Sequence, residues 1–287
     1  MRRIVRSEAI CLRVRDYHES SKLVTFFTLE HGKVSCLAKG ARRLRSKFGA
    51  ALDLFAQSRI IYYLRETRDL YTLSDAELVH SFSGLANGPE RFLAAEQMAE
   101  FVLRTIQSHD PSPQLYRLLL NYLSTIESVC PDPRPLTPGP FPALVCSFLL
   151  KAASFLGFRP ELRRCLICRR PIEGQRPAYF EPGRGGVICP RCAGERRDMT
   201  EIGSAISDRV PSLTRLDPAS LDTLAFLLYT PASDIATLVP SPSSQSLVPG
   251  PQPPTPLLDL VLGFLGHHFD PLVLNSFHWH AGLERNV

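Results

Sequence analysis

Four cysteines in two close pairs are the residues of this sequence with the most specific chemistry. Cys165 and Cys168 form one C-x-x-C pair, and Cys189 and Cys192 form a second pair after twenty intervening residues. Each pair can place two sulfurs at adjacent corners of a tetrahedron, the geometry that Zn²⁺ adopts with four thiolates. Because all four corners are filled by protein, no position remains for water or substrate. We therefore expect one structural Zn²⁺ ion per chain.

Other uses of cysteine fit this sequence less well. A redox-active C-x-x-C motif normally accompanies a βαβ pattern, which is missing here, and two pairs are present. A zinc deaminase needs an H-x-E element and a proline before the second pair, but the sequence has no H-x-E and residue 188 is Ile188. The other cysteines lie mostly in apolar contexts, and we expect them to be small buried residues. They are Cys11, Cys36, Cys130 and Cys146.

A basic cluster near the N-terminus suggests a second kind of chemistry. Residues 39–47 hold five cations and no acid, and Lys33 extends the cluster along the chain. The five cations are Lys39, Arg42, Arg43, Arg45 and Lys47. Neutralising DNA phosphates with several Lys or Arg side chains releases bound counterions and so favours binding. Nucleic-acid binding by these six residues is one interpretation, and an ordinary solvated basic loop is the other.

A second basic stretch surrounds the cysteine pairs. Residues 159–197 contain ten arginines and no lysine. Guanidinium groups suit phosphates and carboxylates alike, so nucleic acid, an acidic protein tail and plain solvation all stay open. Net charge is +6 over residues 1–80, +6 over 159–197 and −6 over 198–287, which predicts separate surfaces for separate partners.

Sequence motifs of enzymes are missing. The chain has no Walker loop, no G-x-G-x-x-G, no G-x-S-x-G and no H-E-x-x-H. We therefore expect a binding protein and not an enzyme.

The elements that must position these residues fall into at least two regions. The chain has 287 residues, of which 44% are hydrophobic, enough for two or three modules. Apolar and polar residues alternate from Ile10 to Arg15, and four more short apolar segments follow before residue 80. Five short strands suit a small closed barrel, either an OB-fold or an SH3-like barrel.

Helical periodicity replaces this alternation after Asn87-Gly88-Pro89. Apolar stripes predict helices through residues 92–106, 115–126, 144–156, 221–228 and 257–265. The segment 231–256 holds eight prolines among several serines, and we expect it to be a flexible loop. Neither a secretory signal nor an apolar run of bilayer length is visible, so we expect no membrane contact and a cytosolic location.

Several stretches together resemble the RecO family of bacterial recombination mediators. They are residues 8–24 (EAICLRVRDYHESSKLV), 31–35 (HGKVS), 38–43 (AKGARR), 70–78 (LYTLSDAEL) and 155–162 (FLGFRPEL) leading into Cys165. The resemblance is dense over residues 7–82 and patchy through the helices. The four cysteines match a zinc-bearing branch of that family.

This resemblance implies a multidomain α+β protein. An OB-fold DNA-binding domain would span 1–82, and an α-helical domain would span 83–287, with the zinc knuckle at 159–197 set into it. RecO-like proteins bind single- and double-stranded DNA and anneal complementary strands. With RecR they help RecA to load onto DNA covered by single-stranded DNA-binding protein. The implied location is the cytoplasm, in association with the nucleoid.

The sequence also differs from the family pattern in two places. The Pro/Ser-rich segment is unusually long, and Arg285 is the only cation after Arg215, where the family commonly keeps basic residues. The alternative function is a zinc-stabilised adaptor whose basic surfaces hold acidic protein tails without binding DNA directly.

Overall fold

The structure is a computed structural model. It describes residues 3–64, 69–129, 139–172, 176–194, 213–237, 255–269, 272 and 274–277. These fall into two compact units: unit 1 lies within residues 1–131 and 273–287, and unit 2 lies within 132–272. The arginines at 196 and 197 and the cysteine at 130 lie outside the described residues.

In its described residues, unit 1 contains five strands and two α-helices, with three short 3₁₀ turns. Its elements are β1 (Arg3–Tyr17), β2 (Ser21–Thr28), β3 (Gly32–Ala38), η1 (Gly49–Leu52), β4 (Gln57–Leu64), β5 (Leu70–His80), η2 (Ser83–Asn87), α1 (Pro89–Thr105), α2 (Pro113–Ser128) and η4 (Asn275–Phe277). Unit 2 contains three strands and four named α-helices. Its elements are α3 (Phe141–Phe155), β6 (Ala178–Glu181), η3 (Pro182–Arg184), β7 (Gly186–Ile188), β8 (Thr214–Leu216), α5 (Pro218–Tyr229), α6 (Ala232–Thr237) and α7 (Thr255–His268).

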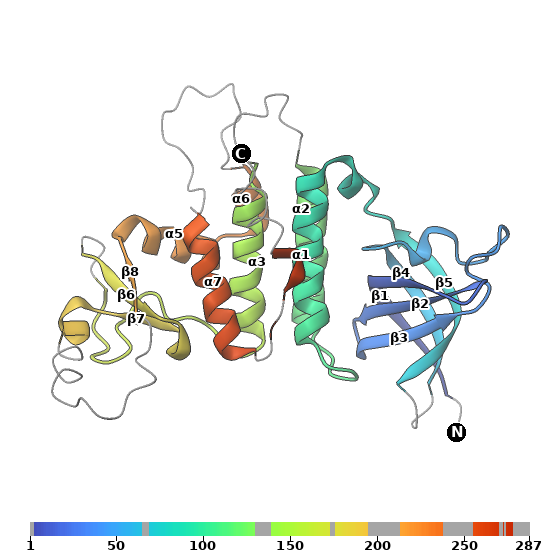
Figure 1. Cartoon of the computed structure of the whole chain (residues 1–287), viewed down its shortest axis with the longest axis horizontal. Coiled ribbons are helices and arrows are strands. Elements are labelled where there is room, and N and C mark those ends of the chain that lie inside the picture. The colour runs from blue at the N-terminus through green and yellow to red at the C-terminus, as the bar shows by residue number, and fades with distance from the viewer. Residues whose placement is uncertain are drawn as a thin grey trace. The chain divides into compact units, whose positions relative to one another are not determined.

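The five N-terminal strands form a closed barrel in the order β1-β2-β3-β5-β4 (Figure 1). All neighbouring strands are antiparallel except β3 and β5, which pair in parallel over Ser35–Leu37 and Leu70–Thr72. This connectivity is that of the five-stranded OB-fold, so the OB-fold prediction is confirmed against the SH3-like alternative.

The residues of β1 that face the barrel interior do not alternate regularly along the whole strand. Ala9 and Cys11 are fully buried in the interior cluster, whereas Arg13 and Arg15 are exposed. A β-bulge between Cys11 and Arg13 adds a residue to β1, so that Val14, and not Arg13, packs against the same cluster as Ala9 and Cys11. Burial of Cys11, Cys36 and Cys146 confirms their expected role as small apolar residues.

One side of the barrel is covered by helices of the same unit. The rings of Phe27 on β2 and Tyr116 on α2 lie 5.6 Å apart between their centroids. Gly32 begins β3 with φ +64°, and a Cβ there would lie 2.3 Å from the carbonyl oxygen of Asp110. Only glycine fits this close approach between the barrel and the segment before α2.

The C-terminal segment returns to unit 1. Glu100 on α1 accepts hydrogen bonds from the backbone N–H of Asn275 at 3.0 Å and of Ser276 at 2.8 Å, and a third from the Ser276 hydroxyl. Burial raises the pKa of Glu100, but these hydrogen bonds and Arg104 outweigh it, so the pKa is lower than usual. Glu100 therefore holds η4 against α1 as a carboxylate.

Unit 2 is built around α3, which is apolar on nearly every side. Its residues are buried from Phe141 to Ala153 with few exceptions, as expected for a helix surrounded by protein. Helices α5, α6 and α7 all contact it. Asp217 caps α5 by accepting from Ser220 N–H at 2.7 Å, as the Asp217-Pro218 start predicts.

The prediction of a flexible loop over residues 231–256 is wrong at the start of that segment. Residues Ala232–Thr237 form α6, because Ala232 and Ile235 supply two buried apolar side chains between the prolines. The last predicted helix is also longer than expected and spans Thr255–His268. The rest of the predicted loop, 238–254, lies outside the described residues. Of the helices the structure describes, none is both long and apolar enough to cross a membrane.

Candidate metal centre and candidate nucleic-acid interface

The first cysteine pair lies on a tight turn held by backbone hydrogen bonds. The N–H of Cys165 donates to Arg170 O at 2.9 Å, and the N–H of Arg169 donates back to Cys165 O at 3.0 Å. Arg169 takes the left-handed conformation, with φ 62°, that such a turn needs. Leu166 N–H also donates to Val187 O at 2.9 Å, which fixes the turn against β7.

The second pair follows directly from β7. Cys189 comes immediately after the strand, and Cys192 lies on a short helical turn that begins at Pro190. Gly186 on β7 leaves no room for a side chain, because a Cβ there would lie 2.9 Å from Glu161 O. Strand β7 can therefore lie close enough to the first turn for the two pairs to meet.

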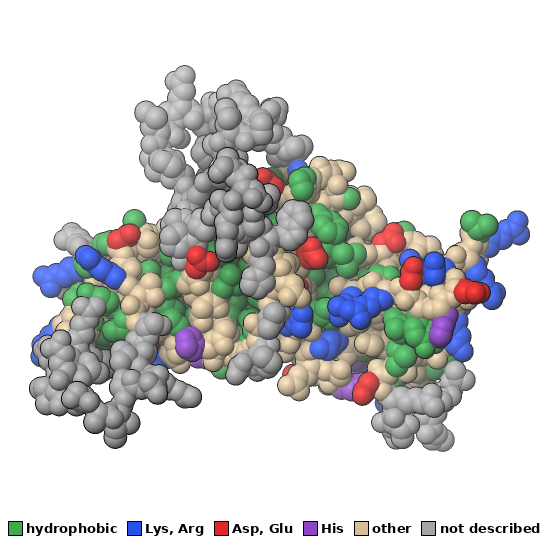
Figure 2. All heavy atoms as spheres, viewed as in Figure 1, with side chains coloured by type: hydrophobic (Ala, Val, Ile, Leu, Met, Phe, Trp, Pro, Cys, Tyr) green, Lys and Arg blue, Asp and Glu red, His purple; other side chains and the backbone are tan. Residues whose placement is uncertain are grey.

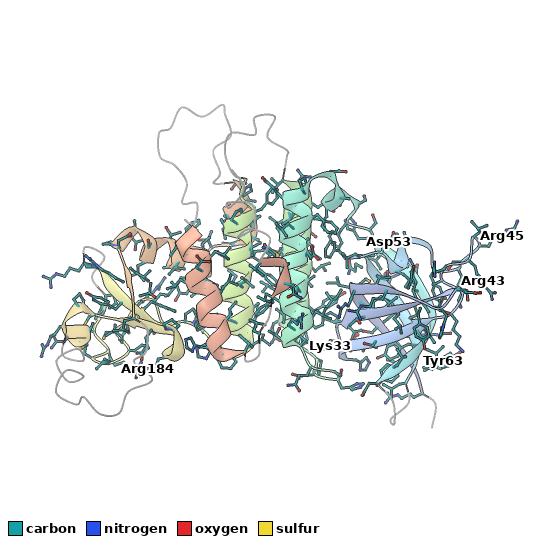
Figure 3. All side chains as sticks on the ribbon, in the orientation of Figure 1. Lys33, Arg43, Arg45, Asp53, Tyr63 and Arg184 are labelled. Carbon is teal, nitrogen blue, oxygen red and sulfur yellow. The ribbon has the colours of Figure 1, made fainter. Side chains whose placement is uncertain are left out.

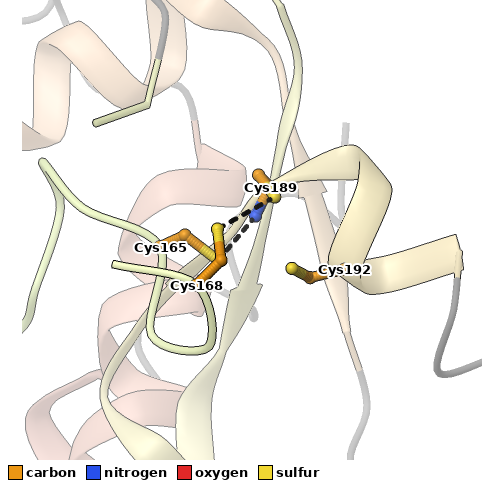
Figure 4. Close-up of side chains that lie close together, drawn as sticks. All are labelled: Cys165, Cys168, Cys189 and Cys192. Carbon is orange, nitrogen blue, oxygen red and sulfur yellow. Dashed lines mark hydrogen bonds between the residues drawn. The ribbon is translucent and has the colours of Figure 1, made fainter. Parts of the chain in front are cut away.

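All four sulfurs converge on one point (Figure 4). The four Sγ atoms lie within 4.8 Å of one another, and Cys168 Sγ is 3.8 Å from Cys189 Sγ. Zn–S bonds of about 2.3 Å in a tetrahedron separate the sulfurs by about 3.8 Å. The cluster can thus hold a metal ion, and its size and four-thiol donor set fit Zn²⁺.

The charge state of the cluster also favours a cation. Burial raises the pKa of Cys165, but hydrogen bonds from the backbone N–H groups of Cys189, Cys168 and Ile167 outweigh it and lower the pKa to about 6. Burial and the neighbouring sulfurs raise the pKa of Cys192 to about 12. Four thiolates at this spacing repel one another, so they ionise together only around a positive ion.

The apolar core beside the cysteines is small. Its core cluster contains four buried residues, two of which are themselves cysteines of the centre. They are Cys165, Ile188, Cys192 and Ala193. A metal ion held by the four cysteines would add to this small core.

The basic loop at residues 39–47 lies at the end of the barrel farthest from α1 and α2 (Figure 3). Its five cations, Lys39, Arg42, Arg43, Arg45 and Lys47, are all exposed. Arg42 anchors the loop to the β1–β2 turn: its guanidinium donates to His18 O at 2.9 Å and lies 3.4 Å from Asp16. Figure 2 shows Lys and Arg side chains gathered at this end of the barrel.

Lys33 does not belong to this surface. Its side chain is half-buried, and Nζ donates to the carbonyl oxygen of Leu103 on α1 at 3.1 Å. Burial lowers its pKa. Figure 3 shows Lys33 on the side of the barrel that faces α1, away from Arg43 and Arg45. Lys33 is close to the basic loop in the sequence, but strand β3 separates it from the loop in the fold.

Most aromatic residues of the barrel are interior and so cannot stack on bases. Phe26, Phe48, Tyr62 and Tyr71 are buried in the interior cluster. Tyr17, beside the basic loop, is 37% exposed, and its ring lies 4.1 Å from that of His18. Leu44, between Arg43 and Arg45, is fully exposed. Sequence reasoning alone does not single out Tyr17 and Leu44, because alternation cannot tell which residues face outward at a turn.

Comparisons with known proteins agree with this architecture. The family model described as "Recombination protein O N terminal" matches residues 1–82, and the model described as "Recombination protein O C terminal" matches residues 87–245. A protein named DNA repair protein RecO from Anaeromyxobacter sp. (strain K) is 31% identical over 264 residues, covering 92% of this chain and 91% of the relative.

Two further relatives carry the same name. DNA repair protein RecO of Heliobacterium modesticaldum is 34% identical, with 77% of this chain and 78% of the relative covered. That of Symbiobacterium thermophilum is 36% identical, with 66% of this chain and 71% of the relative covered. Both family models and these similarities lead to one conclusion: this chain belongs to the RecO family.

Proposed function

We propose that this protein is a non-enzymatic DNA repair and recombination mediator that binds single- and double-stranded DNA and anneals complementary strands. The observation that carries the proposal is the exposed basic loop of an OB-fold barrel. Its five cations project at one end of the barrel with Tyr17 and Leu44 beside them.

The physical mechanism is charge neutralisation. Two DNA strands repel each other through their phosphates, and cations on one protein surface lower that repulsion when both strands bind. Tyr17 and Leu44 supply the non-ionic contacts: an exposed ring stacks on bases, and an exposed aliphatic side chain packs against them. Base pairing then completes annealing without a chemical step by the protein.

Bound Zn²⁺ would be structural in this mechanism. Cys165, Cys168, Cys189 and Cys192 would hold it, and it would order the segment between the two pairs. The four sulfurs would fill all four coordination positions of the ion, so none would be open for water or substrate.

The proposed partners follow from membership of the family. The protein would act with RecR on DNA covered by single-stranded DNA-binding protein and so help RecA to load. Such work takes place in the bacterial cytoplasm, on the nucleoid.

The test is DNA binding by the purified full-length protein without partner proteins. We expect Lys39→Glu/Arg43→Glu/Arg45→Glu to weaken binding of a labelled single-stranded oligonucleotide. Each lost phosphate contact reduces the slope of log K against log salt by about 0.7. Arg117→Glu, a charge reversal on the exposed face of α2, is the control and should leave the slope at the value of the unaltered protein.

A slope that stays the same in the triple variant contradicts the assignment of the loop. Failure of the unaltered protein to bind the oligonucleotide in dilute buffer contradicts direct DNA binding altogether. That second result would favour a zinc-stabilised adaptor that holds acidic protein tails.

A further inference from the structure

Unit 2 carries a second strongly basic surface, separate from the barrel loop. Between residues 159 and 170 the chain has five arginines, all exposed, and one acid. These five, named here the knuckle arginines, are Arg159, Arg163, Arg164, Arg169 and Arg170. Figure 2 shows Lys and Arg side chains over the region of β6 and β8.

The one acid in this stretch does not neutralise the arginines. A carboxylate oxygen of Glu161 accepts the backbone N–H of Arg163 at 2.9 Å and that of Arg164 at 3.1 Å. In the part of the chain that the structure describes, no ion pair involves the side chains of Arg164, Arg169 or Arg170. Several positive charges without a carboxylate partner therefore stand close together in the sequence and in the fold.

The fold brings four of these arginines together on one turn. Arg164 pairs with Pro171 in an antiparallel bridge, and Ile172 N–H donates to Arg163 O at 2.9 Å. Arg163 and Arg164 thus lie on one arm of the turn that holds Cys165 and Cys168, and Arg169 and Arg170 lie on the other. The metal centre that fixes this turn also fixes the positions of its arginines.

Tyr229, at the end of α5, orients two of the guanidinium groups. Arg163 lies over its ring at 4.3 Å from the centroid and Arg159 at 5.3 Å. A guanidinium that lies over an aromatic ring still presents N–H donors at its edge, in the geometry that suits a phosphate. Tyr229 and Ile167 are themselves 39% and 42% exposed, so apolar surface is interleaved with the charge.

From these observations we infer that the knuckle arginines form a second nucleic-acid surface, which binds the phosphate backbone of a strand. Interleaved cations and exposed apolar side chains are the pattern of surfaces that bind single strands. The inference rests on the proposed function, because both require DNA as the ligand. Its consequence is that each unit holds its own stretch of DNA, so one molecule can hold two strands during annealing.

The experiment compares five full-length proteins. They are the unaltered protein, the knuckle variant Arg164→Glu/Arg170→Glu, the loop variant Lys39→Glu/Arg43→Glu/Arg45→Glu, all five substitutions together, and the control Arg117→Glu. Binding of a labelled single-stranded oligonucleotide is measured over a salt series. Metal content is measured in parallel, and an unchanged value shows that the turn is still folded.

We expect the knuckle variant to reduce the log K against log salt slope by about 1.4, the share of two phosphates on a single strand. We expect a similar reduction between the loop variant and the protein with all five substitutions, because the two surfaces lie in different units. Annealing of two complementary oligonucleotides slows in the knuckle variant. Arg117→Glu leaves the slope and the annealing rate at the values of the unaltered protein.

An unchanged slope in a metal-replete knuckle variant overturns this inference and leaves the barrel loop untouched. A reduced slope in the knuckle variant together with no effect of the loop variant overturns the loop and keeps the inference. A labelled oligo-glutamate peptide provides the last comparison. Loss of peptide binding with unchanged DNA binding would identify a protein-docking surface and overturn the inference.

Discussion

The backbone N–H of Cys189 donates a hydrogen bond to Sγ of Cys165 over 3.4 Å, joining the two halves of the metal centre. This contact crosses from the strand end that supplies the second pair to the turn that supplies the first. It orients Cys165 Sγ toward the other three sulfurs, so the site is formed by the fold and the ion completes it.

The first prediction concerns this centre. Cys168→Ser should abolish tight binding of Zn²⁺, because three thiolates and a hydroxyl bind zinc far more weakly than four thiolates. Cys168 is exposed, so the substitution removes little packing of its own. Metal analysis of freshly purified reduced protein should give one zinc per chain before the change and much less after it. Limited proteolysis should then cut within the segment from Cys165 to Cys192.

Cys146→Ala is the matched control for that variant. Cys146 is buried in α3 and lies outside the cluster, so this protein should retain its zinc. Full zinc content in Cys168→Ser would show that Cys168 is not a ligand.

The second prediction separates stacking from charge at the barrel. Tyr17→Ala should weaken binding of single-stranded DNA by about 1–3 kcal/mol, the usual contribution of a base–aromatic contact. The slope of log K against log salt should stay the same, because no ionic contact is lost. Fluorescence anisotropy over a salt series measures both quantities. Tyr17→Phe, which keeps the ring, should restore the affinity, and failure to do so would argue against stacking.

The third prediction is a dependence on pH at Glu100. Its pKa is lower in the folded chain than in the unfolded chain, so its stabilising effect is complete above the ordinary value of about 4.3. That effect should disappear as the pH falls through the lower folded value. Hydrogen-exchange protection of the Asn275 and Ser276 amides should decrease over the same interval.

Glu100→Gln provides the comparison for this pH effect. Without a titrating carboxylate, protection of these amides should be weaker at neutral pH and nearly constant down to pH values near 3. If the substituted protein loses protection on acidification as steeply as the unaltered one, another group is responsible.

The fourth prediction tests the close approach at Gly32. Gly32→Ala should lower the free energy of unfolding by about 1–2 kcal/mol for the positive φ and by about 1–3 kcal/mol more for the clash with Asp110. Gly49→Ala shares a positive φ of 48° but has no atom within 4 Å of the added methyl, so it should show only the first cost. Denaturant unfolding of both variants measures the difference, and equal costs would show that the barrel tolerates the methyl.

The clustering of the four cysteines was predictable from sequence because ligand spacing is a local property. Cys165 to Cys168 and Cys189 to Cys192 are each three residues apart, and a short hairpin is enough to join them. The five barrel strands were predictable for a similar reason, since Arg13 and Arg15 mark the exposed side of β1. The bulge that moves Cys11 and Val14 to the same interior face depends on strand pairing, which a single strand does not encode.

The basic surface was only partly predictable. Charge density correctly located an exposed basic loop at residues 39–47, but it also included Lys33, whose amine contacts α1 instead. Which aromatic side chains are exposed depends on the closure of the whole barrel. Tyr17 and Tyr71 are both tyrosines on barrel strands, yet the structure exposes the first and buries the second.

The hydrogen bonds between Glu100 and residues 275–276 also bear on the order of synthesis. A ribosome produces α1 long before it produces Asn275 and Ser276, and domains generally fold as their residues emerge. These contacts of unit 1 therefore form only after all of unit 2 has been translated. A nascent chain released early would lack the last contacts of its N-terminal unit, even with every strand of the barrel already made.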